Sequence, residues 1–306
     1  EFIQEHRDNL HLLDVPMVPR YLRILTKNGL DFTVPEATVE VKDRMITPDP
    51  FLALPDKDEV FRVHYEEDYE VKALHLTISD RGEIKATQRM SRARNLHKVT
   101  GASYESLIMV TSLGGYYKLP MYMFENLTES VLMQDLYDDY DKKEKVVGAF
   151  TLQEDMAQAM EVYFVTEEGI VKRTPCKDFL EDHSKGHVLK FKNPTDKLLY
   201  AEAFGEDLEE TILLVSEKGM AIRFETSSIS LLSKNATGVL GMNLKEEDRV
   251  FFAKVITDEK ELILASKGND DETIALGDIK LQNRATRGKN IMALYLGDTV
   301  NKAELQ

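Results

Sequence analysis

The stretch Leu213-Leu214-Val215-Ser216-Glu217-Lys218-Gly219-Met220-Ala221-Ile222-Arg223-Phe224 decides the fold. It has two apolar runs separated by a short polar turn that ends in glycine. Apolar and β-branched side chains favour the pleated, half-buried surface of a sheet. The glycine supplies the positive φ that a tight hairpin turn requires, at no steric cost. The stretch therefore predicts a β-hairpin.

The same pattern occurs five further times along the chain. Each copy has an apolar run, a Thr or Ser, two variable residues and a glycine, and in the last copy the hydroxyl residue comes one place late. The other turn glycines are Gly29, Gly82, Gly114, Gly169 and Gly268. Counted in chain order, the six glycines are 53, 32, 55, 50 and 49 residues apart. A period near fifty indicates a repeat architecture, and the gap of 32 indicates that one repeat is shortened.

A second sequence pattern, a glycine followed ten residues later by an aspartate, recurs with the same period as the last three hairpins, and we call it the second marker. Glycines at 186, 238 and 288 follow their turn glycines by 17, 19 and 20 residues, and each precedes an aspartate by ten. We expect these glycines to lie in turns or bulges. We expect the aspartates Asp196, Asp248 and Asp298 to close turns, since identical repeated positions rarely all do chemistry.

Repeats of about fifty residues without a convincing amphipathic helix fit four short strands each. Six such sheets arranged radially form a propeller, which leaves only short, protected edges. The sequence thus predicts an all-β protein of six four-stranded blades with one blade shortened. We expect residues 19–306 to form a single domain and residues 1–18 to be a linker or closing strand.

Composition excludes several classes of protein. The 306 residues carry a formal charge of −15, which argues against a uniformly basic nucleic-acid coat but leaves room for a local basic stripe. No apolar run approaches the roughly 20 residues that cross a bilayer, and Cys176, the single cysteine, rules out an internal disulfide framework. The beginning of the chain has no signal-peptide pattern, so we expect a fragment of a cytoplasmic protein.

A search for catalytic and metal-binding patterns finds none. The seven histidines show no ligand spacing for zinc, and the chain has no phosphate-cradling glycine loop and no strand-elbow serine. We therefore expect no catalytic residues, no metal site and no cofactor in this chain. A propeller glycosidase would require inward-facing carboxylates around a channel, for which the sequence offers no support.

Several segments resemble blade motifs of the C-terminal domain that the A subunits of DNA gyrase and topoisomerase IV share. They are Thr111–Gly114, Thr166–Arg173, Gly219–Phe224, Ala236–Asp248 and Arg284–Gly288. Ala236–Asp248 is the most specific and is similar to Gram-positive-type topoisomerase IV. The resemblance covers about Ala73 to Leu296. It implies a six-bladed β-pinwheel whose outer rim binds and bends duplex DNA, with ATP, Mg²⁺ and DNA cleavage belonging to other domains of the parent enzyme.

Two stretches depart from the family pattern. Gyrase has a glycine- and arginine-rich box after its first hairpin, whereas the matching stretch here, Gln88–Leu96, is basic but has no glycine pair. This difference favours a topoisomerase IV-like domain. After Gly268 the chain continues Asn269-Asp270-Asp271-Glu272, where the family usually has Lys or Arg, which puts DNA contact by the sixth repeat in question.

Positive side chains recur at similar places in the repeats and form the predicted DNA-binding set. Lys85, Lys118, Lys172, Arg173 and Arg223 stand three or four places after a turn glycine. Arg89, Arg92 and Arg94 follow in the basic stretch, and Lys234, Arg287 and Lys289 flank the second marker. Such cations bind phosphates without regard to base sequence. A solvated strand position is the plainer interpretation of any one of them.

The resemblance thus implies a non-catalytic domain from the A subunit of a bacterial type IIA topoisomerase, one that binds and bends duplex DNA and guides it for strand passage. Its expected partners are duplex DNA, the catalytic domains of the same polypeptide and the B subunit that carries the ATPase. Its expected location is the cytoplasm at the nucleoid. The rival hypothesis is a protein-interaction propeller that has lost its affinity for DNA, which the charge of −15 and the acidic sixth repeat favour.

Overall fold

The computed structural model describes residues 20–36, 53–55, 58–66, 70–93, 96–180, 184–205, 210–268 and 271–306. The chain divides into two compact units, Glu1–Glu70 and Val71–Gln306. Each unit contains antiparallel sheets, and the described residues form six sheets in all. The all-β class and the six small sheets predicted from the sequence are confirmed. The single domain predicted for residues 19–306 stays a prediction.

The first unit contains one three-stranded sheet with the order β2-β1-β3. Its strands are β1 (Tyr21–Thr26), β2 (Asp31–Pro35) and β3 (Val60–Tyr65). The hairpin of β1 and β2 turns at Gly29, whose φ is 93°.

The second unit contains five sheets, and a hairpin predicted from the sequence lies at the centre of each. The hairpin strands are β4 (Ala73–Ile78) with β5 (Glu83–Thr87), β7 (Ser106–Thr111) with β8 (Gly115–Pro120), β11 (Met160–Thr166) with β12 (Ile170–Pro175), β15 (Thr211–Ser216) with β16 (Met220–Glu225), and β19 (Glu261–Ser266) with β20 (Glu272–Ala275). Of the five turn glycines, the first four have φ between 76° and 79°, as the hairpin argument requires.

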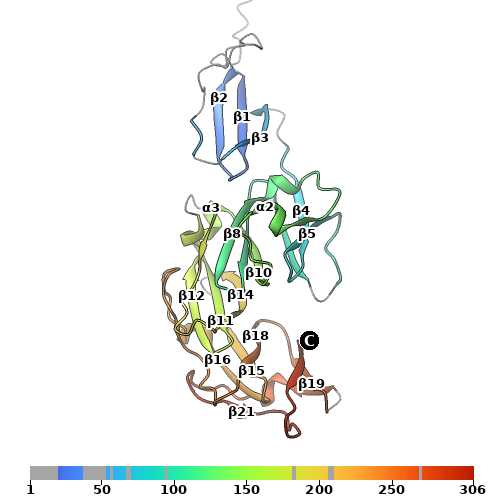
Figure 1. Cartoon of the computed structure of the whole chain (residues 1–306), viewed down its shortest axis with the longest axis vertical. Helices are drawn as coiled ribbons and strands as arrows, with labels where there is room; N and C mark the ends of the chain where they lie inside the picture. Colours follow the sequence, from blue (N-terminus) through green and yellow to red (C-terminus); the bar gives the residue numbers. More distant parts are fainter. Residues whose placement is uncertain are drawn as a thin grey trace, which may run out of the picture. The chain divides into compact units, whose positions relative to one another are not determined.

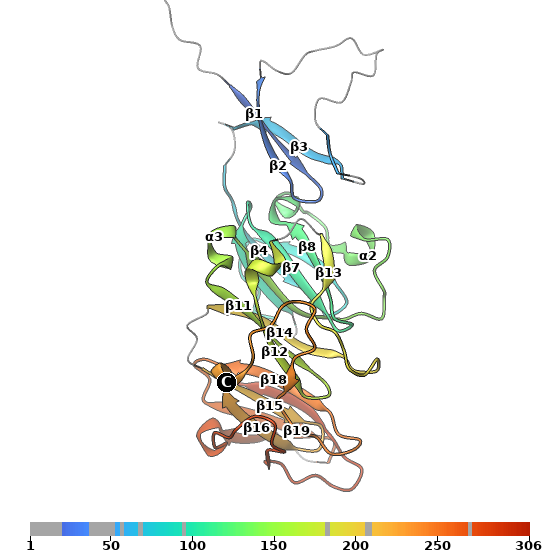
Figure 2. The ribbon, with the colours of Figure 1, turned by 90° about the vertical axis from the view of Figure 1, so that its left-hand side faces the viewer.

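A third strand pairs with the first strand of each hairpin. These strands are β6 (His97–Ala102), β10 (Val146–Leu152), β14 (Leu198–Gly205), β18 (Val250–Ile256) and β22 (Val300–Leu305). They contact one another in this order, so the sheets of the second unit follow each other in chain order (Figures 1 and 2). We call these five the inner strands.

A fourth, short strand completes four of the sheets, and it comes from the next repeat along the chain. These donated strands are β9 (Val131–Leu132), β13 (Lys185–His187), β17 (Val239–Leu240) and β21 (Lys289–Asn290), which pair with β5, β8, β12 and β16. Every four-stranded sheet is therefore joined to its successor by exchanged backbone hydrogen bonds as well as by side-chain packing.

The 32-residue gap between Gly82 and Gly114 now has a structural explanation. In this shortened repeat, the basic stretch Gln88–Leu96 lies where the following repeats have a donated strand, between the hairpin and the inner strand. Among the described residues, β2 has no strand on its outer edge, and β20 in the last sheet has none either. The first and last sheets therefore have three strands rather than the four predicted.

Short helices occupy some of the connections. They are η4 (Met121–Phe124), η5 (Cys176–Phe179), η6 (Thr226–Ser228) and η7 (Leu276–Asp278), together with α2 (Met133–Leu136) and α3 (Glu154–Ala157). Cys176 begins η5; it is buried, and burial raises the pKa of its thiol to about 12.

The hydrophobic core of the second unit lies between successive sheets. Both faces of the central strands are covered: on β11, Val162 and Phe164 pack toward the preceding sheet, and Tyr163 and Val165 toward the following one. Each fully buried apolar side chain of this size contributes about 1.5–3 kcal/mol. This two-sided burial explains the continuous apolar runs that precede the turn glycines in the sequence.

Candidate nucleic-acid interface

Lys172 does not lie on the exposed rim where the sequence placed it. Its side chain is completely buried, and its ammonium group donates hydrogen bonds to the carbonyl oxygens of Val188, Ser233 (3.0 Å), Lys234 (2.8 Å) and Ala236 (3.2 Å). Burial lowers the pKa of Lys172 to about 8. Three of these carbonyls belong to the next repeat, so Lys172 fixes a loop of that repeat in place.

Three of the predicted DNA contacts reach into the next repeat in the same way. Lys118 Nζ donates to the Leu180 carbonyl (3.3 Å), Arg173 Nε to that of Ile229 (2.8 Å), and a guanidinium nitrogen of Arg223 to that of Leu276 (2.7 Å). Each acceptor stands at or directly after a 3₁₀ helix. We call these three contacts the latches. The regular spacing of these three cations thus follows from contacts that each repeat makes with the next one.

Arg173 is further held by an ion pair with Glu161 across the β11–β12 hairpin. The two groups are 2.9 Å apart and their side chains are only 17% and 9% exposed. A phosphate that approached Arg173 would have to displace a largely desolvated carboxylate, which costs several kcal/mol.

Lys234 is half-buried beside two aromatic rings. Its ammonium lies 5.3 Å from the centre of the Tyr116 ring and 5.7 Å from that of Phe179. The Tyr116 ring itself is buried. Lys234 therefore contacts side chains of two other repeats.

The other predicted cations lie on the surface. Lys85, Arg89, Arg92, Arg287 and Lys289 are exposed, and Arg94 lies outside the described residues. Lys85 pairs with Glu83 at 3.0 Å, whereas the side chains of Arg89, Arg92, Arg287 and Lys289 have no ion pair with any residue that the structure describes. These side chains are available to an anionic ligand.

The structure brings Arg287 together with two cations that the sequence analysis did not select. Arg287, Lys218 and Lys245 line a pocket of about 190 Å³ beside the donated strand β21, and Asn290 adds an amide. We call Arg287, Lys289, Lys218 and Lys245 the rim cluster. Lys245 could have been found from the sequence, because it lies within the motif Ala236–Asp248 on which the resemblance rests.

The marker glycines allow two backbones to approach each other closely. Gly238 and Gly288 have φ of 93° and 75° and directly precede donated strands. A Cβ atom on Gly288 would lie 2.2 Å from the Ala221 carbonyl oxygen, and one on Gly238 would lie 2.8 Å from that of Val171. These glycines thus let the backbone before the donated strand approach the partner strand more closely than a residue with a Cβ atom could, and they do not form an ordinary turn.

The aspartates of the second marker close turns, as the sequence predicted. Asp196 and Asp248 accept hydrogen bonds from turn amides of their own hairpins, at Glu168 N (3.0 Å) and Lys218 N (3.2 Å). Asp298 accepts one from the amide of Gly268 (2.9 Å). In the first unit Asp58 does the same for Asn28 (3.0 Å). Asp58 was missed, although its separation of 29 residues from Gly29 matches that between Gly219 and Asp248.

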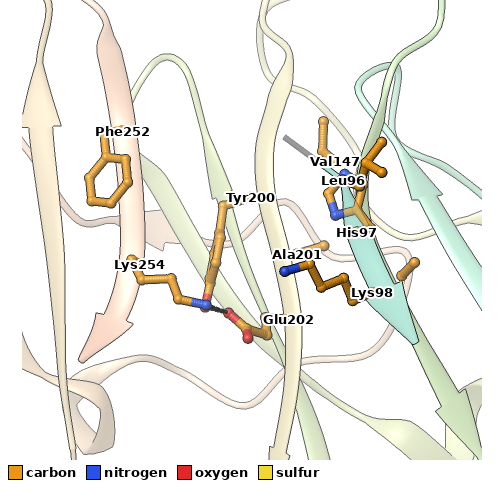
Figure 3. A pocket seen from close by; sticks show the side chains of 10 residues that line it. Leu96, His97, Lys98, Val147, Tyr200, Ala201, Glu202, Phe252 and Lys254 are labelled. Carbon is orange, nitrogen blue, oxygen red and sulfur yellow. Dashed lines mark hydrogen bonds and ion pairs between the residues drawn. The ribbon is translucent and has the colours of Figure 1, made fainter. Parts of the chain in front are cut away.

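A pocket of about 560 Å³ opens between four of the inner strands (Figure 3). Across it, Glu202 accepts hydrogen bonds from the Tyr200 hydroxyl (2.6 Å) and from Lys254 (2.5 Å). His97 bonds the Val146 carbonyl at 3.0 Å, and burial lowers the pKa of this histidine. Tyr200 and Lys254 thus both satisfy Glu202, and the contact between Glu202 and Lys254 joins two successive repeats.

The described part of the chain offers neither a cluster of metal ligands nor a membrane-spanning helix. No three His, Cys, Asp or Glu side chains gather there as a metal ion would require. None of the helices described is long and apolar enough to span a bilayer.

The chain matches known proteins over most of the second unit. The profile of the DNA gyrase C-terminal domain, a β-propeller, matches residues 105–153, 161–203, 210–257 and 273–305. The A subunit of DNA gyrase from Kosmotoga olearia is 27% identical over 242 residues, and the A subunit of DNA topoisomerase 4 from Bacillus subtilis is 22% identical over 249 residues. These alignments include 72% and 76% of this chain but 30% of each relative, so the chain spans about a third of their length.

Two solved structures share the fold. The crystal structure of the C-terminal domain of DNA topoisomerase IV has a TM-score of 0.69 at 20% identity, covering 78% of each chain. The C-terminal domain of E. coli ParC has a TM-score of 0.60 at 15% identity, covering 76% of this chain and 98% of that one. With the family profile matched over more than half of its residues, the chain belongs to the DNA gyrase C-terminal domain family.

Proposed function

We propose that this chain binds duplex DNA as the non-catalytic C-terminal domain of a type IIA topoisomerase A subunit, and that it holds and bends the DNA segment for strand passage. Membership of the family supports this role. The observation that carries the proposal is the rim cluster, in which the exposed cations of Arg287, Lys218 and Lys245 line one pocket beside a donated strand, with Asp248 as the carboxylate of that lining.

The chemistry of the rim cluster suits a DNA backbone. Lysine and arginine bind phosphate oxygens through charge-assisted hydrogen bonds, and the asparagine amide adds a neutral donor. Bending a short site by tens of degrees costs on the order of 1–6 kcal/mol, so further contacts are needed. Arg89 and Arg92 supply two more exposed cations in the same unit.

We propose a topoisomerase IV-like parent, in which ATP hydrolysis and DNA cleavage reside in other domains and in a B subunit. The glycine-free stretch Gln88–Leu96 supports this assignment over gyrase. The similar proteins include subunits of both enzymes, so supercoiling and decatenation assays of the full-length parent would decide between them.

The test is a salt titration of duplex binding with the double variant Arg287→Glu/Lys289→Glu. Each lost phosphate contact flattens the plot of log K against log salt by about 0.9, so we expect a slope about 1.8 units shallower and at least tenfold weaker binding near 0.1 M salt. The matched control is Lys177→Glu/Lys280→Glu, which makes the same charge change at two other exposed lysines. Equal affinities and slopes for the two double variants would refute the rim model.

A second candidate function is protein binding by a propeller without DNA affinity. The specific observation in its favour is that Lys172, Arg173 and Arg223 are committed to contacts within the chain, which leaves fewer cations to offset a charge of −15. A gel-shift titration with a short duplex at low salt separates the candidates, because this alternative predicts no shift at any protein concentration.

A further inference from the structure

A second basic pocket lies in the same unit, and none of its lining residues belongs to the set proposed above for DNA. It has a volume of about 630 Å³, and its lining includes Arg81, Lys142, Lys143 and Lys145, together with Tyr140 and Gln134. It is formed by the β4–β5 turn, the start of α2 and the loop that leads into β10. Four cations around one hollow are notable in a chain with a net charge of −15.

The cations of this pocket are largely unneutralised. Arg81, Lys142 and Lys143 have no ion pair with any described residue, and Lys145 has only a loose pair with Asp80 at 3.9 Å between two exposed side chains. Glu144 is the one carboxylate among the described residues of the lining, and burial raises its pKa, which disfavours its negative charge. Among the described residues of the lining, four cations therefore stand against one carboxylate, while Asp80 and Asp141 are neighbours of these cations in the chain.

The backbone of the β4–β5 turn, which carries Arg81, is held in place by hydrogen bonds. The amide of Val146 donates to the Asp80 carbonyl (2.7 Å), and that of Met133 donates to the Gly82 carbonyl (3.0 Å). Tyr140 is buried against Tyr117, with ring centres 5.6 Å apart. The turn that carries Arg81 is thus held from two sides, which reduces the cost of ordering it around a ligand.

We propose that this pocket binds a free polyphosphate anion. Several adjacent phosphates would satisfy cations that converge from the turn and from the loop, and the volume lies within the usual range for small-molecule sites. The carboxylates of Asp80 and Asp141 stand beside the cations, and they would repel the long, continuous backbone of a duplex over more of its length than a compact anion.

The experiment is calorimetric titration of the whole chain with sodium tripolyphosphate at low ionic strength. The triple variant Arg81→Gln/Lys142→Gln/Lys143→Gln should bind at least tenfold more weakly. The control Lys177→Gln/Lys260→Gln/Lys280→Gln removes the same charge from exposed lysines elsewhere and should bind as the unaltered chain does. Absence of binding, or an equal loss in the control, overturns the proposal.

A second arm uses a short DNA duplex with the same proteins. We expect the triple variant to bind the duplex as the control does, because the pocket shares no residue with the rim cluster. A parallel loss of tripolyphosphate and duplex binding in the triple variant would overturn the proposal and assign the pocket to DNA. Loss of duplex binding in Arg287→Glu/Lys289→Glu with tripolyphosphate binding intact would support both sites separately.

Discussion

Lys172 shows how one cation can serve the fold instead of a ligand. Its four carbonyl partners replace the water that burial removes, and three of them belong to the next repeat. Charge reversal here, or at the latches Arg173 and Arg223, would disturb the contact between repeats, so any loss of DNA binding in such variants would have a structural cause.

The change Lys172→Ala should destabilise the chain by on the order of 3 kcal/mol, because it leaves buried carbonyl groups without a donor. Urea unfolding followed by circular dichroism measures the loss. The control is Lys177→Ala, an exposed lysine five residues away, for which we expect a change within about 0.5 kcal/mol. Equal stability of the two variants would contradict the role assigned to Lys172.

The stability that depends on Lys172 should vary with pH. Its pKa falls from 10.5 to about 8 on folding, so between these values the unfolded chain holds the proton more tightly. The unaltered chain should therefore gain stability over Lys172→Met as pH rises from 8 to 9.5, by at most about 1.4 kcal/mol per pH unit. Unfolding free energies at four pH values test this, and a constant difference would show that the pKa is not lowered.

At the scale of the element, the donated strands depend on glycines that no other residue can replace. The change Gly288→Ala places a Cβ 2.2 Å from the Ala221 carbonyl at a φ of 75°. We expect a loss of about 2 kcal/mol or more and faster hydrogen exchange of the β16 amides that face β21. Gly277→Ala is the control, since its Cβ meets nothing within 4 Å. Unchanged exchange in β16 would mean that β21 does not depend on Gly288.

The hairpins were predictable from the sequence and the donated strands were not. A hairpin has a local sequence signature, namely two apolar runs on either side of a glycine that can adopt a positive φ. A donated strand such as Val239–Leu240 is two residues long and pairs with a strand almost seventy residues upstream, so no local periodicity marks it. Its marker glycine was found, but the close approach of two backbones at that glycine needs the structure.

The candidate interface was predicted only in part, because place in the repeat does not fix exposure. Lys85 and Lys172 both stand three residues after a turn glycine, yet the first is 55% exposed and the second completely buried. The difference comes from the loop at Ser233–Ala236, which covers Lys172 and belongs to another repeat. Arg287 and Lys289 were predicted and are exposed, whereas Lys218 joins them only through folding.

At the scale of the whole molecule, the second unit contains its own core. All four hydrophobic clusters consist of residues from Leu74 onward. We expect a fragment of residues Val71–Gln306 to fold alone, with the near-UV circular dichroism of a packed protein and a cooperative urea transition. A fragment that binds hydrophobic dyes and unfolds without cooperativity would contradict this expectation.

Strand donation also bears on how such a molecule changes size in evolution. Because four consecutive repeats of the second unit each donate a short strand to the repeat before, an in-frame tandem duplication of one of them would create a new sheet that pairs with both neighbours in the way already present. Loss of one such segment would bring the donated strand of the next repeat to the hairpin of the preceding one. The number of repeats can therefore differ between relatives while the strand pairing between successive repeats stays the same. Such a domain can become longer or shorter with the contacts that it already has.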